Sequence, residues 1–509
     1  MRRWQPARLA GAAGARLVAA GAGTGAEPGP RGASVDSRTL APGELFIGLR
    51  GERSDGGEHA ADALAAGAWG VLVAPEHAER ALAAVACGVV LAHPQPLRGL
   101  QALARAWREE LGEGGARVVA ITGSTGKTST KDILAALLSP HLRVVASPEN
   151  LNTEIGMPLA MLAAPAGTEL LVLEMAMRGE GQIAELTSIA LPDVGVIVNV
   201  GPVHLELLGS LPAIAAAKAE LIAGLGPDAR VVVPAAEPLL QRHLRADLQT
   251  ITFGPGGDVS LAEARPAGAP QARDHTRQPT PERAEGGEIL IRLGPGALRR
   301  RDGGEGAQGQ ALVRLRPSFA QAHNLRNLLA AVAAARALGI TPEGEELRVS
   351  FSSLRGERLQ MPGGVVLIND CYNANPMSMH AAIDDLAETA AGRRVAVLGD
   401  MLELGDGARE FHRQVGEHAA QQDVGLLVTV GALAAEIGAG FGKEAIAVPD
   451  ARAAAEALPG LLRAGDTVLV KGSRGVGLEL IAEVLRGAGR AGDHGEAPLG
   501  GLVAGPRSR

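Results

Sequence analysis

Residues 118–134, VVAITGSTGKTSTKDIL, place an apolar run, a loop bracketed by glycines and the start of a helix in immediate succession. The apolar run predicts a buried strand, and the helix is expected to begin just after the second glycine. A strand, a glycine-rich loop with Gly-Lys-Thr and a helix are the parts of a phosphate-binding site, because backbone N–H groups at a helix N-terminus face phosphate oxygens. The stretch therefore predicts an α/β domain that binds a nucleotide.

The loop is shorter than the common phosphate loop. Two residues separate Gly123 from the Gly126–Lys127 pair, whereas the common loop has a longer spacer. In the shorter loop Lys127 can still reach the β- and γ-phosphates, and the Thr128 hydroxyl can bind Mg²⁺. The alternative is an ordinary glycine-rich turn, which we disfavour because strand, Gly-Lys-Thr and helix occur in order.

Composition excludes several classes of protein. The chain has 509 residues, a formal net charge of −7 and 46% hydrophobic residues, which argues for a globular protein and against binding nucleic acid or anionic membranes by bulk attraction. Its only cysteines, Cys87 and Cys371, form no CxxC motif, which is typical of a reducing compartment. The N-terminal Ala-rich stretch is interrupted by Arg8 and Arg16 and makes a poor signal peptide. We expect a cytoplasmic enzyme.

The pattern along the chain indicates an α/β protein of three domains. Residues 31–100 alternate short apolar strands with Ala-rich helices, and a helix then ends at a Gly-rich break. From residue 116, near-continuous apolar strands alternate with helices, which predicts a parallel sheet covered on both faces. We predict a small N-terminal α/β domain, a central P-loop-type parallel-sheet domain, a C-terminal Rossmann-like α/β domain and a disordered tail, at 1–113, 114–345, 346–488 and 489–509.

One segment of the central domain has a different composition. Residues 255–310 are rich in Gly, Pro, Arg and Glu. Within them and just beyond, 288–293 and 311–317 are expected to be two strands joined by a disordered loop. Arg299–Arg301 could form a functional basic patch, but such charge runs are usually solvated loops.

Three further residues follow or accompany strands of the central domain. Glu174 ends the strand "ELLVLEM", where a carboxylate lies on the ligand side of a parallel sheet and could hold Mg²⁺; a solvated glutamate fits that position equally well. His204 follows the next strand and, taken alone, is more often structural than a ligand. Lys218 lies in the helix "AIAAAKAELIAGL", where a solvated lysine is the simplest interpretation.

Two other places combine polar residues with a helix start or a strand end. Asn324 and Asn327 stand three apart at a helix start; an N-cap explains one of them, and two amides on one face could read the edge of a base. Lys471 and Arg474 follow an apolar strand in "VLVKGSRG", which could be an anion site or a simple turn.

The loop "NDCYNANPMSM" is crowded with polar side chains. Asp370, Asn373 and Asn375 lie together there with Tyr372, the only tyrosine in the chain. This is more than a turn requires, but an Asx-rich turn closed by Pro376 remains the alternative.

Taken together, these pieces resemble the Mur ligase superfamily over nearly the whole chain. "TGSTGKTS" is similar to the family's ATP loop, and "NLNTEIGMP", "LEMAMRGEGQI", "NVGPVHLELLGS" and "AAAKAELI" occur in the family's order and spacing. The third-domain motifs "NDCYNANPMSM", "VAVLGDMLELG" and "VLVKGSR" are similar to those of members that add D-alanyl-D-alanine. The DYAHxP- and DNPR-type motifs of the members that add the third residue are absent, as is the DGAHNP of folylpolyglutamate synthase.

The resemblance implies an ATP-dependent amide ligase that forms ADP and phosphate. It implies that D-alanyl-D-alanine is joined to a UDP-N-acetylmuramoyl-tripeptide through an acyl phosphate, the last cytoplasmic step toward the peptidoglycan pentapeptide precursor. It further implies Mg²⁺, a second Mg²⁺ held by a carbamate on Lys218, and a monomer that neither binds nucleic acid nor inserts into a membrane.

The matching motifs assign roles residue by residue. The nucleotide would meet Gly123, Ser124, Thr125, Gly126, Lys127, Thr128, Ser129, Asn324, Asn327, Arg358 and Asp370. Mg²⁺ would be surrounded by Thr128, Glu174, His204 and Lys218. The other substrates would meet Asp36, Ser37, Arg38, Asn152, Thr153, Tyr372, Asn373, Asn375 and Lys471. The catalytic residues would be Lys127, Lys218, His204 and Arg358.

Two other classes of protein remain alternatives. One is a P-loop regulator or motor that uses hydrolysis to drive a switch, and the other is a non-catalytic binder of cell-wall nucleotides. Phosphate release that depends on both the nucleotide-peptide and the dipeptide would exclude both.

Overall fold

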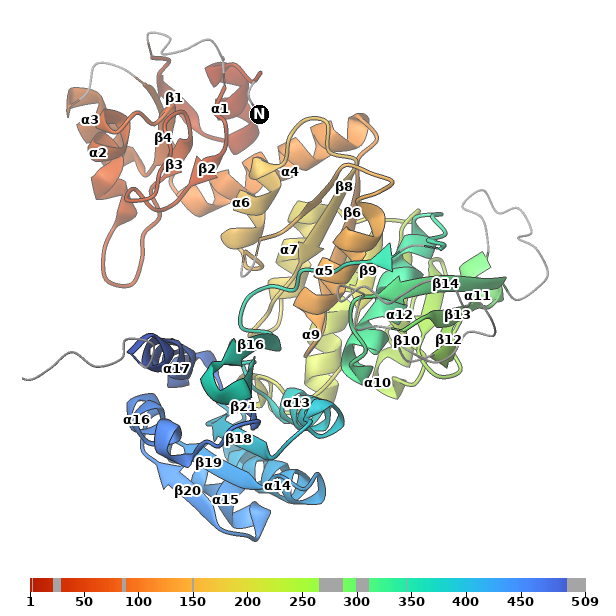
Figure 1. The fold of residues 1–509 in the computed structure, drawn as a ribbon. Coiled ribbons are helices and arrows are strands. Elements are labelled where there is room, and N and C mark those ends of the chain that lie inside the picture. Colours follow the sequence, from red (N-terminus) through yellow and green to blue (C-terminus); the bar gives the residue numbers. More distant parts are fainter. Residues whose placement is uncertain are drawn as a thin grey trace, which may run out of the picture. The chain divides into compact units, whose positions relative to one another are not determined.

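The structure, a computed structural model, describes residues 1, 3–21, 29–84, 88–148, 151–264, 287–298, 311–344 and 346–491. The chain divides into two compact units after Ser352. The first unit carries a five-stranded and a ten-stranded sheet, and the second carries a six-stranded sheet (Figure 1). This confirms the predicted α/β fold of three domains, while the exact domain boundaries stay a prediction.

The N-terminal domain is built on the five-stranded sheet. Its order is β1-β5-β4-β3-β2, with β1 antiparallel to β5 and the other neighbours parallel. Helix α4 packs on α1 and also on α6 and α7 of the central domain. The elements are α1 (Pro6–Ala13), β1 (Arg16–Ala19), β2 (Ala33–Ser34), β3 (Leu45–Ile47), η1 (Gly56–His59), α2 (Ala60–Ala65), β4 (Gly70–Val73), α3 (Pro75–Ala84), β5 (Val89–Ala92) and α4 (Pro96–Glu113).

The central domain places the predicted phosphate loop in the middle of a parallel sheet. Strand β6 (Arg117–Thr122) pairs in parallel with β8 (Leu170–Glu174) on one side and β9 (Val194–Ile197) on the other. The carboxyl ends of these three strands therefore meet at one edge of the sheet, where ligands of such sheets bind. Helix α5 (Lys127–Leu138) begins directly after the loop.

The remaining central elements complete a ten-stranded sheet in the order β15-β14-β13-β12-β11-β10-β9-β6-β8-β7. They are β7 (Val144–Ala146), α6 (Gly156–Ala163), α7 (Gln182–Ala190), α8 (Leu205–Leu208), α9 (Leu211–Ala223), β10 (Arg230–Pro234), α10 (Pro238–Gln241), β11 (Gln249–Phe253), β12 (Val259–Ala264), β13 (Ile289–Leu293), α11 (Pro295–Leu298), β14 (Ala311–Pro317), α12 (Ala322–Ala337) and β15 (Glu346–Leu347).

The prediction of a parallel sheet is wrong at one end. Strand β13 pairs antiparallel with both β12 and β14, so this end of the sheet is not parallel. The two strands expected at 288–293 and 311–317 are confirmed as β13 and β14. Arg299–Arg301 and the loop around them lie outside the described residues, as do residues 492–509 of the predicted tail.

Apolar layers cover both faces of the central sheet. Helices α5 and α12 pack together and share one buried cluster with the sheet, including Ile133, Leu137 and Leu328. On the other face a second cluster joins α4, α6, α7 and α9 to the strands. The predicted coverage of both faces is confirmed, and it holds the strand ends of the site in place.

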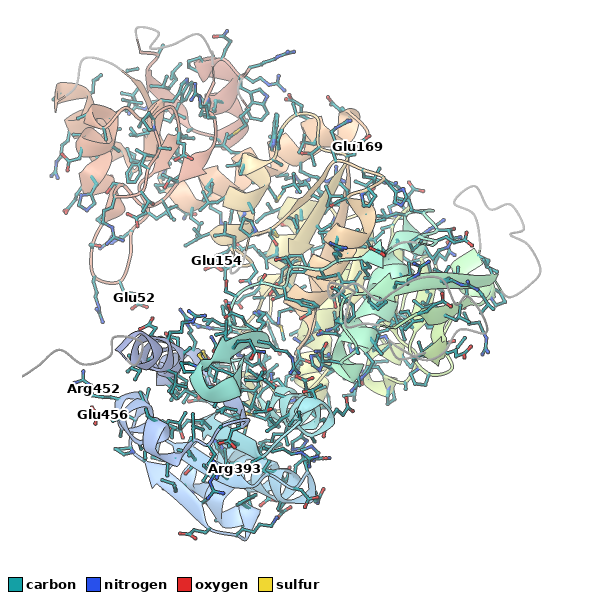
Figure 2. All side chains as sticks on the ribbon, viewed as in Figure 1. Glu52, Glu154, Glu169, Arg393, Arg452 and Glu456 are labelled. Atoms are coloured by element: carbon teal, nitrogen blue, oxygen red, sulfur yellow. The ribbon has the colours of Figure 1, made fainter. Side chains whose placement is uncertain are left out.

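The C-terminal domain contains a six-stranded sheet in the order β16-β17-β21-β18-β19-β20, of which only β16 runs antiparallel. Arg393, labelled in Figure 2, forms a 2.6 Å ion pair with Asp466 and links the starts of β18 and β21. The elements are β16 (Glu357–Met361), η2 (Pro362–Gly364), β17 (Val365–Asn369), α13 (Pro376–Thr389), β18 (Arg394–Gly399), η3 (Gly405–Gly407), α14 (Ala408–Gln421), β19 (Leu426–Val430), α15 (Ala435–Phe441), β20 (Ala445–Val448), α16 (Ala451–Leu461), β21 (Thr467–Lys471), η4 (Arg474–Val476) and α17 (Glu479–Ala491).

None of the helices in the described part of the chain is both long enough and apolar enough to span a membrane.

Candidate active site

The loop between β6 and α5 has the conformation that a phosphate site requires. Gly126 is the N-cap of α5 and adopts φ 75°, in the left-handed region. Lys127 is the first helical residue, and its Nζ donates a 2.9 Å hydrogen bond to the carbonyl of Gly123. Thr128 and Ser129 complete the start of the helix, where backbone N–H groups lack intrahelical partners. The geometry at this helix start fits an anion.

Asn199 supports the loop, and the sequence analysis missed it. Its Oδ1 accepts hydrogen bonds from the N–H groups of Ser124, at 3.0 Å, and Thr125, at 2.9 Å. Its Nδ2 donates to the carbonyl and the hydroxyl of Thr125. The N–H groups of Ser124 and Thr125 already donate to Asn199. The N–H groups that remain available to a phosphate are therefore those from Gly126 onward. The only signal in the sequence was an amide just after a buried strand.

The predicted amide pair lies against the same loop. Asn324 and Asn327, on α12, are both buried, and their side chains are joined by a 3.5 Å contact. A Cβ added to Gly126 would lie 2.4 Å from the Oδ1 of Asn327. Position 126 therefore needs glycine both for its backbone conformation and for the close approach of α12.

We predict that Gly126→Ala lowers the free energy of unfolding by about 3 kcal/mol, since strain at positive φ adds to overpacking. Gly209→Ala is the matched control, because Gly209 has φ 74° but nothing within 4 Å of an added Cβ; it should cost only about 1 kcal/mol. Thermal melts compare the two. Adding Asn327→Gly to Gly126→Ala should recover the difference, and equal costs for both single variants would contradict the proposed contact.

Glu174 is buried at the end of β8, beside the loop. Its side chain is 1% exposed, so the solvated alternative is wrong. Its Oε2 accepts a 2.7 Å hydrogen bond from the Thr128 hydroxyl, and its Oε1 accepts a 2.9 Å bond from the Nδ2 of Asn152. Among the described residues no cationic side chain is paired with this carboxylate. Such a group costs free energy unless it meets a cation, and therefore suits a site for Mg²⁺.

Lys218 is also buried, contrary to the simplest interpretation of its sequence. It is 2% exposed on α9, and within the described residues its Nζ has neither an acid nor a hydrogen-bond acceptor as partner. Burial, together with the charge of Lys127, lowers the pKa of Lys218 well below its ordinary value. A lowered pKa favours the neutral form of the amine, which is the nucleophilic form.

His204, predicted near the metal, and Thr153, predicted to meet a substrate, lie at or before the starts of helices α8 and α6. His204 is half-buried and adopts φ 53° at the start of α8, a conformation that is uncommon for residues other than glycine. Thr153 is exposed and accepts a 3.4 Å hydrogen bond from the N–H of Gly156 at the start of α6. Within the described ranges, no group of three or more His, Cys, Asp or Glu side chains could hold a metal ion.

In the N-terminal domain, Asp36, Ser37 and Arg38 follow β2 in a turn; Asp36 and Ser37 are half-buried and Arg38 is exposed. Asp36 accepts hydrogen bonds from the backbone N–H and from the guanidinium of Arg38, whose Nη2 lies 2.7 Å from its Oδ2. The side-chain hydrogen bond from Arg38 holds the pKa of Asp36 at about 2. The turn is thus already ordered by its own ion pair.

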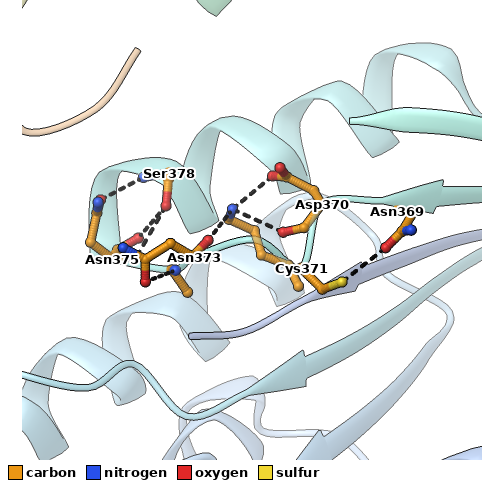
Figure 3. Close-up of polar contacts among 8 residues, drawn as sticks. Asn369, Asp370, Cys371, Asn373, Asn375 and Ser378 are labelled. Carbon is orange, nitrogen blue, oxygen red and sulfur yellow. Dashed lines mark hydrogen bonds and ion pairs between the residues drawn. The ribbon is translucent and has the colours of Figure 1, made fainter. Parts of the chain in front are cut away.

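The C-terminal domain joins the loop after β17 to the end of β21. Lys471 is buried, and its Nζ contacts the Oδ2 of Asp370 at 2.7 Å and the carbonyl of Asn373 at 2.9 Å. Figure 3 shows Asp370 and Asn373 in contact with the same amine, that of Lys471. Asn375 is the N-cap of α13, where it forms a capping box with Ser378, and Pro376 is the first residue of that helix.

Arg358 is occupied by an acid of its own domain. Its Nη2 donates to both carboxylate oxygens of Asp385, at 3.0 and 2.9 Å, and to the hydroxyl of Thr389 at 2.7 Å. Burial raises the pKa of Asp385 even though Arg358 opposes the shift. Tyr372 is half-buried, and the guanidinium groups of Arg355 and Arg474 lie over its ring.

A short phosphate loop and a buried carboxylate at adjacent strand ends, together with a buried lysine on α9, define a nucleotide-using enzyme of the α/β class. Family models agree with this class: the Mur ligase middle domain matches residues 121–278, and the Mur ligase, glutamate ligase domain matches residues 354–474. The chain belongs to the Mur ligase family.

Individual relatives narrow the comparison. The chain is 35% identical to the UDP-N-acetylmuramoyl-tripeptide–D-alanyl-D-alanine ligase of Bacillus subtilis, over 89% of this chain and 93% of the relative. A crystal structure of MurF from Acinetobacter baumannii has a TM-score of 0.76 and 27% identity, covering 95% of this chain and 99% of that one. The MurF ligase of Thermotoga maritima in complex with ADP has a TM-score of 0.72 and 29% identity, covering 91% and 98%.

Proposed function

We propose that this protein is an ATP-dependent ligase that joins D-alanyl-D-alanine to a UDP-N-acetylmuramoyl-tripeptide. The observation that carries this proposal is the 35% identity that extends over 93% of a relative named for that reaction. The products are ADP, phosphate and the nucleotide-linked pentapeptide of peptidoglycan synthesis. The phosphate loop and the buried side chains of Glu174 and Lys218, described above, offer the chemical groups that such a reaction needs.

The phosphate loop is the proposed ATP site. The N–H groups at the start of α5 would meet phosphate oxygens, and Lys127 would leave the carbonyl of Gly123 to reach the β- and γ-phosphates. Asn324 and Asn327 would lie near the base. The ADP in the Thermotoga maritima relative supports a nucleotide as the ligand. Arg358 and Asp370 would close on the nucleotide only after exchanging their present partners, Asp385 and Lys471.

The residues at the end of β8 fit Mg²⁺. A buried carboxylate without a cationic partner and the adjacent Thr128 hydroxyl offer hard oxygen ligands, and Mg²⁺ characteristically combines one or two protein ligands with phosphate oxygens and water. His204 would stand at the same site. When bound, Mg²⁺ would neutralise charge on the transferring phosphoryl group.

Lys218 fits a carbamate. A protonated lysine would repel cations, whereas a carbamate formed from the neutral amine and CO₂ carries a negative charge and two oxygen ligands for a second Mg²⁺. The lowered pKa of Lys218 favours the neutral amine, which is the form that reacts with CO₂. In the described part of the chain, no acid is paired with the Nζ of Lys218. This also favours a modification that makes the charge of the side chain negative.

The reaction follows from the chemistry of carboxylates, which do not condense with amines unaided. The terminal carboxylate of the tripeptide attacks the γ-phosphorus of ATP, so that ADP leaves and an acyl phosphate forms. The amine of the dipeptide then attacks the acyl carbon, phosphate leaves and the amine loses a proton. Lys127 stabilises the charge on the transferring phosphoryl group. The site must also position both reactants and keep water from the acyl phosphate.

The other proposed partners and conditions follow from this reaction. Asp36, Ser37 and Arg38 would meet the uridine nucleotide in the N-terminal domain, and Asn152 and Thr153 would lie on the substrate side of the central domain. The cytoplasm is the compartment that supplies ATP and nucleotide-linked precursors, and we place the protein there. We expect it to act as a monomer.

We predict that purified protein with Mg²⁺, ATP, UDP-N-acetylmuramoyl-tripeptide and D-alanyl-D-alanine releases phosphate and forms the pentapeptide product. Phosphate release and the mass of the product are the measurements. Omitting either the tripeptide or the dipeptide should stop steady phosphate release. The acyl phosphate forms only from the carboxylate of the tripeptide, and it releases phosphate only when the amine of the dipeptide attacks it. Equal release without the dipeptide would indicate a plain nucleotidase instead.

A further inference from the structure

Tyr372 brings together two arginines that the proposed reaction does not yet use. The guanidinium carbon of Arg355 lies 4.1 Å from the ring centroid, and that of Arg474 lies 5.9 Å away. Tyr372 follows β17 and Arg474 follows β21, and these two strands are parallel neighbours. Arg355 reaches the same ring from the segment before β16. Three separate segments thus place two guanidinium groups at the carboxyl edge of this sheet, where ligands bind.

The positive charge at this ring is not balanced within the domain. Arg355 is paired with no acid among the described residues. Arg474 has one, Glu479, whose Oε1 lies 3.9 Å from its Nη2. The nearby Lys471 is already paired with Asp370 at 2.7 Å. Two like charges over one ring repel each other unless an anion is shared between them. The arrangement therefore has room for one further negative charge.

The backbone holds Arg355 in this place at some cost. Leu354 adopts φ 60°, in the left-handed region, and its carbonyl accepts a 3.2 Å hydrogen bond from the N–H of Tyr372. This bond joins the segment that carries Arg355 to the loop that carries the ring. A leucine in this conformation is strained, and such strain is concentrated at binding and catalytic sites.

The neighbouring surface is apolar. Leu402, after β18, is 44% exposed, and its N–H donates a 2.9 Å hydrogen bond to the Oγ of Ser473. A Cβ added at Gly475 would lie 3.2 Å from its Cδ1, so Leu402 packs directly on the turn of Arg474. A carboxylate next to small aliphatic groups matches this combination better than a phosphate does.

We propose that Arg355 and Arg474, positioned over Tyr372, bind the terminal carboxylate of the incoming dipeptide. The inference rests on the proposed ligase function and names the residues that recognise its amine substrate. Guanidinium groups bind carboxylates through directed, charge-assisted hydrogen bonds. In this arrangement the dipeptide is held by its carboxyl end, its methyl groups lie toward Leu402, and its amine remains available for the acyl carbon.

The test compares D-alanyl-D-alanine with its C-terminal carboxamide in the full ligation assay. The wild-type protein should prefer the acid through a KM that is lower by about 10- to 100-fold, because hydrogen bonds to charged groups account for such factors. Arg355→Gln and Arg474→Gln should each raise the KM for the acid and leave the KM for the carboxamide nearly unchanged. In the double variant the preference should disappear. Arg452→Gln, an exposed arginine of α16 (Figure 2), is the matched control.

Other outcomes overturn the inference. Unchanged preference for the acid in both single variants would show that the carboxylate is bound elsewhere. A raised KM for ATP with an unaltered KM for the dipeptide would assign the arginines to a phosphate. Arg355→Lys and Arg474→Lys keep the charge and should retain part of the preference, which separates binding from misfolding. Failure of the wild-type protein to ligate any dipeptide would instead refute the proposed function itself.

Discussion

Replacing Lys218 with alanine should leave the protein folded and able to bind nucleotide, yet reduce ligation by about 100-fold or more. The side chain is 2% exposed, and burial and the charge of Lys127 lower its pKa well below the ordinary value. The neutral amine can therefore form a carbamate, and the alanine variant loses both of its oxygens. Phosphate release and product mass measure the loss, and nucleotide binding is measured separately by calorimetry.

Two companion variants make this prediction specific to the carbamate. Lys218→Arg keeps a positive charge but cannot be carbamylated, so it should be as inactive as the alanine variant. Formate or acetate should restore part of the activity of Lys218→Ala by occupying the vacated oxygen positions, but should not restore Lys218→Arg. Incorporation of isotopically labelled bicarbonate should be lost in both variants. Full activity of Lys218→Ala would refute the carbamate.

The burial of Lys218 also makes the stability of the folded protein depend on pH, in a direction that can be predicted. Because the pKa of Lys218 is lowered in the folded protein, the unfolded chain binds a proton that the folded protein has released. Stability therefore rises with pH between the lowered and the ordinary pKa. Lys218→Met removes this cost, so it should melt above the wild-type protein in CO₂-depleted buffer at neutral pH. The difference should shrink as the pH approaches the ordinary pKa of lysine.

Glu174→Gln should stabilise the ligand-free protein by about 1 kcal/mol while reducing ligation by about 100-fold. The wild-type carboxylate is 1% exposed, and among the described residues it accepts hydrogen bonds only from neutral groups, the Thr128 hydroxyl and the Asn152 amide. An amide removes that buried charge but offers Mg²⁺ a weaker ligand. Thermal melts with and without Mg²⁺ and ATP, together with ligation rates, test both parts.

Glu109→Gln is the control for this substitution, because Glu109 is exposed on α4 and pairs only with Arg105. It should change neither the melting temperature nor the rate measurably. In Glu174→Gln the stabilisation by Mg²⁺ and ATP should be much smaller than in the wild-type protein. A variant that still gains full stabilisation from Mg²⁺ and ATP would show that Glu174 does not hold the metal.

Local patterns in the sequence determined the elements around the phosphate loop. The strand expected from the apolar run and the helix expected to begin after Gly126 are β6 (Arg117–Thr122) and α5 (Lys127–Leu138). Such elements depend on periodicity, glycine and the helix start, all of which act over a few residues. Family motifs added roles for residues whose type alone was ambiguous, including Glu174 and His204.

Burial of the charged residues was decided by tertiary structure. Lys218 lies in a mostly apolar helix whose only other charged residue is Glu220. Such a composition favours a buried helix, but lysine by itself indicates solvent. The partners of the phosphate loop were likewise hidden, since Asn199 lies 75 residues beyond Ser124 in the chain. It reaches the loop only because β9 pairs directly with β6.

The ion pairs of the C-terminal domain show the same limit. Asp370 and Lys471 are 101 residues apart and meet because β17 and β21 are neighbours. Arg358 pairs with Asp385. The sequence had suggested that Arg358 binds the nucleotide, and it had suggested no role for Asp385. Hydrophobic periodicity specifies which segments become strands and helices, but strand order specifies which charges meet. That order depends on packing of the whole domain, so only the tertiary structure could decide it.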